Sequence, residues 1–93
     1  MRLLRERARA LAKGDFAFIR KFSTERTNRA TDVFLERAGS QAPVQAREAA
    51  ADLERSLKKL QRVVVRGDRA VVIFPGNEWM NFAHVKGQWL LDD

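Results

Sequence analysis

Residues 62–91 read RVVVRGDRAVVIFPGNEWMNFAHVKGQWLL, and this stretch decides the fold. β-Branched and aromatic residues dominate it, and glycine or proline interrupts it at short intervals. This pattern is typical of antiparallel strands that are joined by tight turns. The stretch therefore predicts a four-strand antiparallel meander.

The turns of this meander also predict how its strands are paired. Residues 66–69 read as a two-residue hairpin turn with glycine at the first central position, which places Val64 opposite Val71. Residues 75–77 (PGN) and 86–87 (KG) form the next two connections. The last turn sets His84 opposite or diagonal to Trp89.

The preceding part of the chain, about residues 2–61, predicts helices that cover the sheet. Apolar residues recur there with a period near 3.6, and glycine or a capping residue separates the segments. The expected helices span about residues 2–13, 16–22, 25–38 and 43–61. Asp15 and Thr24 are the expected N-caps, and Gly14 and Gly39 the expected stops. The fold class is therefore α+β in one domain, residues 1–93, with helices on a curved meander.

The predicted strands are apolar on both faces, although helices can cover only one face of a sheet in so short a chain. Either the sheet curls around the helices, or a partner covers its other face. A symmetric homodimer is the natural form of such a partner. We expect Val72, Phe74 and Trp79 at the dimer interface.

Composition excludes several classes of protein. The chain has no cysteine, so disulfides and thiolate metal sites are excluded, and no metal or cofactor is expected. No apolar run approaches the roughly 18 residues that span a bilayer. The sequence predicts a cytoplasmic protein as the chain stands, and a periplasmic or secreted one if a signal peptide has been removed.

Positive charge is concentrated near the start of the chain. Residues 1–29 hold nine Lys and Arg against three Asp and Glu, whereas residues 30–93 hold nine of each sign. Such asymmetry indicates a solvated helix face or a surface that binds nucleic acid or another polyanion. The candidate anion-binding residues are Arg2, Arg5, Arg9, Lys13, Arg20 and Lys21.

Three segments resemble the nuclear transport factor 2-like superfamily, in particular its small bacterial members. Residues 10–16 (ALAKGDF) are similar to the opening helix and Gly-Asp of those members, and residues 65–72 (VRGDRAVV) to their hairpin. Residues 84–92 (HVKGQWLLD) are similar to their closing strand. The resemblance implies a cone of helices packed into a bent sheet, with a ligand pocket at its open end and pairing through the outer face.

The resemblance and the charge distribution together lead to three readings of function. The first is a non-catalytic module that binds a small apolar ligand or a protein, with a pocket lined by Phe34, Met80, Phe82, His84 and Trp89. The second is polyanion binding through the basic helices. The third is a small enzyme in which His84 acts as a general base, because histidine is the side chain most often used for that role. The residues around His84 in the sequence are apolar, which favours a binding module over an enzyme.

Overall fold

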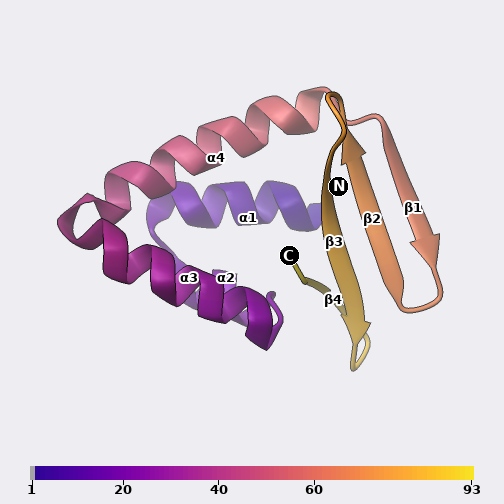
Figure 1. The fold of residues 1–93 in the computed structure, drawn as a ribbon, viewed down its shortest axis with the longest axis horizontal. Helices are drawn as coiled ribbons and strands as arrows, with labels where there is room; N and C mark the ends of the chain where they lie inside the picture. The colour runs from indigo at the N-terminus through magenta and orange to yellow at the C-terminus, as the bar shows by residue number, and fades with distance from the viewer. Residues whose placement is uncertain (1) are drawn as a thin grey trace.

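Four helices are followed by four strands in the computed structural model, which describes residues 2–93 (Figure 1). The predicted α+β class is confirmed, and the sheet remains open rather than closing around the helices. The helices are α1 (Arg2–Lys13), α2 (Phe16–Lys21), α3 (Glu25–Ala38) and α4 (Ala42–Lys58). The strands are β1 (Arg62–Arg66), β2 (Arg69–Phe74), β3 (Glu78–Val85) and β4 (Gln88–Leu91).

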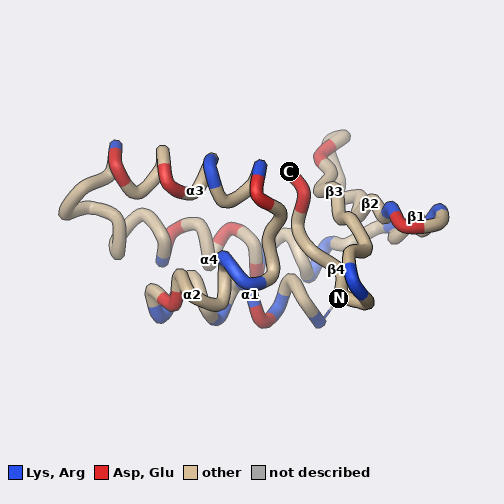
Figure 2. The backbone as a smooth tube through the Cα atoms, turned by 90° about the horizontal axis from the view of Figure 1, so that it is seen from below, with Lys and Arg blue, Asp and Glu red and all other residues tan. Residues whose placement is uncertain are grey.

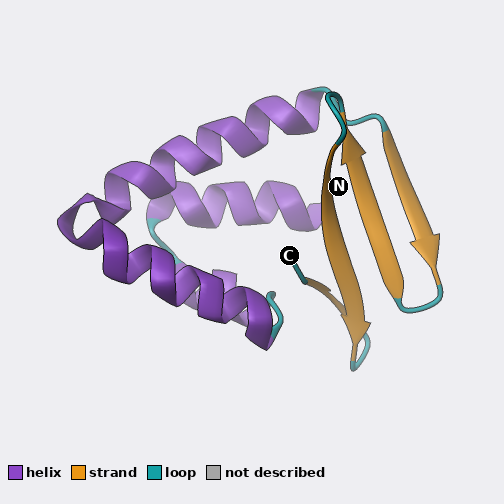
Figure 3. Cartoon of the chain, in the orientation of Figure 1, coloured by secondary structure: helices purple, strands orange, loops and turns teal. Residues whose placement is uncertain are grey.

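Short polar segments separate the helices as the sequence predicts (Figure 3). Gly14 adopts φ 72°, and the Asp15 carboxylate accepts a 3.1 Å hydrogen bond from the backbone N–H of Phe18 at the start of α2. Residues 39–41, expected as a loop, form one turn of 3₁₀ helix. The last helix ends at Lys58, earlier than the expected residue 61, and the chain then turns into β1.

The sheet has the order β1-β2-β3-β4, and every strand is antiparallel to its neighbour. Val64 lies opposite Val71, and His84 lies opposite Trp89, as the turns predict. Gly67 has φ 58°, a conformation that a two-residue turn requires and that glycine adopts without strain. Local turn chemistry therefore sets the register of the whole meander.

The helices cover one face of the sheet, which we call the inner face (Figure 1). The core contains Leu4 of α1, together with Val72, Phe74, Phe82 and Leu91 of the sheet. Leucines of α4 pack around this core, as the leucine stripe of that helix predicts. The inner face is thus built by alternate residues of β2, β3 and β4.

The prediction that Val72 and Phe74 form a dimer interface is wrong. Their side chains are 0% and 4% exposed, because they point into the helix-covered core. Trp79 pairs with Ile73 on the outer face and is 57% exposed. Val72 and Trp79, expected together at one interface, therefore lie on opposite faces of the sheet.

The segment between α2 and α3 is hydrogen-bonded to β4. The segment before α3 runs parallel to β4, and Ser23 forms a bridge with Leu91. The backbone N–H of Thr24 donates to the Leu91 carbonyl at 2.9 Å, and the N–H of Leu91 donates to the Phe22 carbonyl at 3.0 Å. These bonds hold the start of the α3 helix against the last strand.

Asp92 extends this connection through its side chain. Its carboxylate accepts hydrogen bonds from the Thr24 hydroxyl and from Arg69 Nη1, each at 2.7 Å. Thr24 occupies the predicted N-cap position, but its hydroxyl binds Asp92 and makes no capping bond to the backbone of α3. The cap residue therefore joins α3 to the sheet.

A search for membrane-spanning helices across residues 2–93 finds none with the length and apolar character that a bilayer crossing requires.

Candidate functional site

A cavity of about 320 Å³ lies among all four helices and the last strand, and we call it the interhelical cavity. Its volume is at the lower end of the roughly 300–1,000 Å³ that is typical of ligand pockets. Aliphatic and aromatic side chains form most of its wall. They are Leu11 of α1, Phe16 and Ile19 of α2, Ala30 and Phe34 of α3, Ala46 and Ala49 of α4, and Leu91 of β4.

Polar side chains line one part of this cavity: Arg7, Thr27, Thr31 and Asp93. Arg7 Nη1 donates a 2.9 Å hydrogen bond to the Ser23 hydroxyl. Burial lowers the pKa of Arg7, and the negative charge of Asp93 acts in the opposite direction. Arginine is protonated in any protein near neutral pH, so the cavity contains a half-buried positive charge.

Arg7 was not predicted as a site residue, because arginines in a basic helix are usually solvated. Its spacing nevertheless contains a signal. Arg7 follows Leu4 by three residues and precedes Leu11 by four, so it lies near the apolar face of α1. Its side chain is accordingly half-buried, whereas Arg5 and Arg9 are exposed.

The five predicted pocket residues do not line one cavity. Phe34 lines the interhelical cavity, whereas Phe82 is completely buried in the core. His84 is exposed and stacks on Trp89, with 4.9 Å between the ring centroids. The expected pocket would have required the helices to stand away from the inner face of the sheet, and their leucines instead fill that space.

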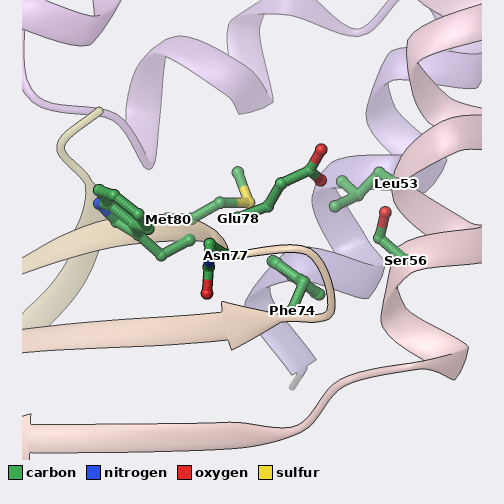
Figure 4. Close-up of a pocket in the computed structure, with 7 residues that line it drawn as sticks. Leu53, Ser56, Phe74, Asn77, Glu78 and Met80 are labelled. Carbon is green, nitrogen blue, oxygen red and sulfur yellow. The ribbon is translucent and has the colours of Figure 1, made fainter.

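Met80, the remaining predicted pocket residue, lines a different hollow of about 390 Å³ between α4 and the β2–β3 turn (Figure 4). Glu78 extends from the sheet toward Leu53 and Ser56 of α4 (Figure 4). Three of its seven lining residues are polar: Ser56, Asn77 and Glu78. This composition makes the hollow a weaker apolar site than the interhelical cavity.

The six predicted anion-binding residues are all exposed. Acidic residues occur among the basic ones along the helices (Figure 2). Arg2 pairs with Glu6 at 3.1 Å, and Arg20 pairs with Asp32. Lys21 lies 5.6 Å from the centroid of the Phe22 ring.

The other three candidates lie on α1. Arg5 and Arg9 line a hollow with Glu54, Leu57 and Lys58 of α4, and Lys13 lies in the last turn of α1. Glu54 offsets part of the positive charge there. Polyanion binding by these residues remains a prediction.

His84 is the residue that the third reading would use for catalysis. Within residues 2–93, no three His, Asp or Glu side chains are close enough to form a metal site. His84 lies outside the interhelical cavity, and its close neighbour is the ring of Trp89. Asp92 is held by Thr24 and Arg69. A general base would need a substrate within hydrogen-bond reach, and His84 does not face the cavity where one could bind.

Comparison with known proteins adds no assignment: no protein-family model, no curated protein and no solved structure matches the chain.

Proposed function

We propose that the protein is a non-catalytic binding module that holds a small apolar acid in the interhelical cavity. The observation that carries this proposal is a cavity with a largely apolar wall and the half-buried guanidinium of Arg7 among its lining groups. The hydrocarbon part of the ligand would contact Leu11, Phe16 and Phe34. Its acid group would accept hydrogen bonds from Arg7.

The charge of Arg7 favours an acid over a neutral ligand, because an acid could replace Asp93 as its negative partner in the cavity. A carboxylate that enters the cavity loses water, and a guanidinium is the side chain best suited to replace that water with paired hydrogen bonds. The hydroxyls of Thr27 and Thr31 lie in the same cavity and add polar partners. The resemblance to the nuclear transport factor 2-like superfamily agrees with a ligand-binding role.

Filling the cavity should abolish ligand binding. Ala49→Trp adds a large ring to an exposed position of α4 that lines the cavity, so we expect the affinity for decanoate, measured by calorimetry, to fall at least tenfold. Ala51→Trp is the matched control, because Ala51 is an exposed alanine of the same helix that does not line the cavity. Equal affinities for the two variants would contradict the proposal.

The role of Arg7 is tested separately. Arg7→Met keeps a long apolar side chain but removes the charge, and it should weaken decanoate binding more than decanol binding. Arg7→Lys should restore part of the preference for the acid. If the ratio of the decanoate and decanol affinities were unchanged in Arg7→Met, the cavity would bind apolar chains without recognising the acid group.

A second proposal concerns self-association, and it rests on the exposure of Trp79. Val71, Ile73 and Trp79 line a mostly apolar hollow of about 320 Å³ on the outer face of the sheet. We propose that two copies pair through this face around Trp79. Such pairing would replace the water over the exposed apolar side chains with the same patch of another copy.

Trp79→Arg should dissociate this dimer without unfolding the monomer, because the side chain lies outside the core. Sedimentation of the wild type at high micromolar concentration should show a dimer, and that of the variant a monomer. Val44→Arg is the control, since Val44 is an exposed apolar residue of α4. A wild type that sediments as a monomer would rule the pairing out.

A further inference from the structure

Strand β1 lies at the free edge of the sheet and is the strand farthest from the helices (Figure 1). Val63 and Val65 project on the inner side of the sheet, yet they are 43% and 58% exposed. The helix layer does not reach them. One face of β1 is therefore an uncovered apolar surface beside the core.

The backbone of β1 is also unpaired along one side. In an antiparallel pair, the N–H and C=O groups of alternate residues bond to the neighbouring strand. The N–H and C=O groups of the remaining β1 residues therefore point away from β2 and out of the sheet. Edge strands are commonly protected by proline, a bulge or a covering segment. Within the described chain β1 has none of these, and its protection consists of the charges of Arg62 and Arg66, so its backbone remains open to a strand whose charges complement them.

The charges of β1 determine which strand fits. Arg62 and Arg66 lie on the same face of β1, on either side of Val64, because side chains alternate along a strand. Both are exposed. Arg66 also lies opposite Arg69, but Arg69 is paired with Asp92, so Arg62 and Arg66 are the charges that an added strand would meet.

These charges disfavour pairing between two copies of β1. A two-fold antiparallel pair centred on Val64 would place Arg62 of each copy directly opposite Arg66 of the other. Like charges that lie directly opposite each other destabilise a strand pair. An acidic strand in the same position would instead make two favourable pairs.

We propose that β1 binds an extended acidic segment of another protein, which adds to the sheet as a fifth, antiparallel strand. The segment carries acidic residues at its first and fifth positions, opposite Arg66 and Arg62. Apolar residues at its second and fourth positions cover Val63 and Val65. Backbone hydrogen bonds supply affinity, and the alternating side chains supply specificity.

The probe is a capped, fluorescently labelled peptide with the core Glu-Val-Thr-Val-Glu, and its binding is followed by anisotropy at low ionic strength. The double variant Arg62→Glu/Arg66→Glu should bind it at least about tenfold more weakly, because two attractions become repulsions. The same variant should gain affinity for the peptide Lys-Val-Thr-Val-Lys. The control Arg37→Glu/Arg47→Glu changes the net charge by the same amount, on exposed positions of α3 and α4. It should keep far more of the wild-type affinity for the acidic peptide than the β1 variant does.

Two peptides with backbone N-methyl groups distinguish strand addition from attraction between charges. One is methylated at its odd positions and the other at its even positions, and only one set of N–H groups faces β1 in an added strand. One peptide should therefore lose binding while the other retains it. Equal binding by both, or an equal loss in the α3/α4 control variant, would overturn the proposal.

The alternative is that two copies of the protein pair through their β1 strands, and disulfide formation by an introduced cysteine would detect such pairing. The chain has no native cysteine, so Val64→Cys introduces a single thiol at the centre of the strand. If copies paired through β1, this variant would oxidise to a dimer much faster than the exposed control Val44→Cys. That result would overturn the proposal, whereas equal slow oxidation of the two variants supports it.

Discussion

Replacing Phe82 by alanine should reduce the free energy of unfolding by about 3–5 kcal/mol. Phe82 is among the largest completely buried side chains, and it contacts the core that joins α1 to the sheet. Its removal leaves a cavity beside Leu4 and Leu91 that the rigid strands cannot close. A domain of this size has about 5–14 kcal/mol of stability in total, so the variant should be close to unfolding at body temperature.

Trp79→Ala is the matched control for this prediction, since both aromatic residues lie on β3 but on opposite faces. Chemical denaturation followed by circular dichroism should show a shift of the midpoint for Phe82→Ala that is several times larger than that for Trp79→Ala. If the two shifts were equal, the helices would cover both faces alike, and the assignment of an inner and an outer face would fail. The comparison uses samples dilute enough to be monomeric.

Asp92→Ala should have the second largest effect, a loss of about 1–3 kcal/mol. The variant removes the acceptor of the Thr24 hydroxyl and of Arg69. The Thr24 bond should account for most of the loss, because it is partly buried, whereas the Arg69 side chain is 63% exposed and its ion pair is weakened by solvent. Thermal unfolding measures the loss. Arg26→Ala removes a 3.6 Å ion pair with the Asp92 carboxylate and a 2.9 Å hydrogen bond to the Asp92 carbonyl, and it should cost less because both contacts are exposed.

The same carboxylate should make stability depend on pH. Hydrogen bonds from Thr24 and then Arg69 lower the pKa of Asp92 in the folded protein. A carboxyl whose folded pKa lies below its unfolded value of about 3.9 contributes stability above that value and loses it as the pH falls through the folded pKa. The stability difference between wild type and Asp92→Asn should therefore shrink from pH 5 downward. A constant difference to pH 2 would contradict this assignment.

Much of the fold could be predicted from the sequence because its signals are local. Two-residue turns around Gly67 and Gly87 fix the strand pairing over a few residues, and Asp15 and Gly39 mark helix ends where the structure places them. These signals depend on backbone conformations that few residue types adopt. These turn and helix-end signals can therefore be recognised in the sequence without knowledge of the tertiary structure.

Little of the candidate site could be predicted from the sequence, because the site depends on how elements that are far apart in the chain pack together. The sequence places Val72 and Trp79 at one interface although they lie on opposite faces, because nothing in a strand of apolar residues shows which face the helices will cover. The cavity around Arg7 combines residues from α1 to β4, and only their packing brings them together. Phe34 alone among the predicted pocket residues lies there.

The bonds between the α3 start and the end of β4 also affect how the chain folds. Thr24 and Asp92 are 68 residues apart, so their contact closes a loop that contains α3, α4 and the whole sheet. Closing so long a loop costs conformational entropy, so this contact forms late, after the helices and the hairpins have formed from nearby residues. During synthesis, the start of α3 leaves the ribosome long before its partner strand. The contact between Thr24 and Asp92 can therefore form only after β4 has emerged.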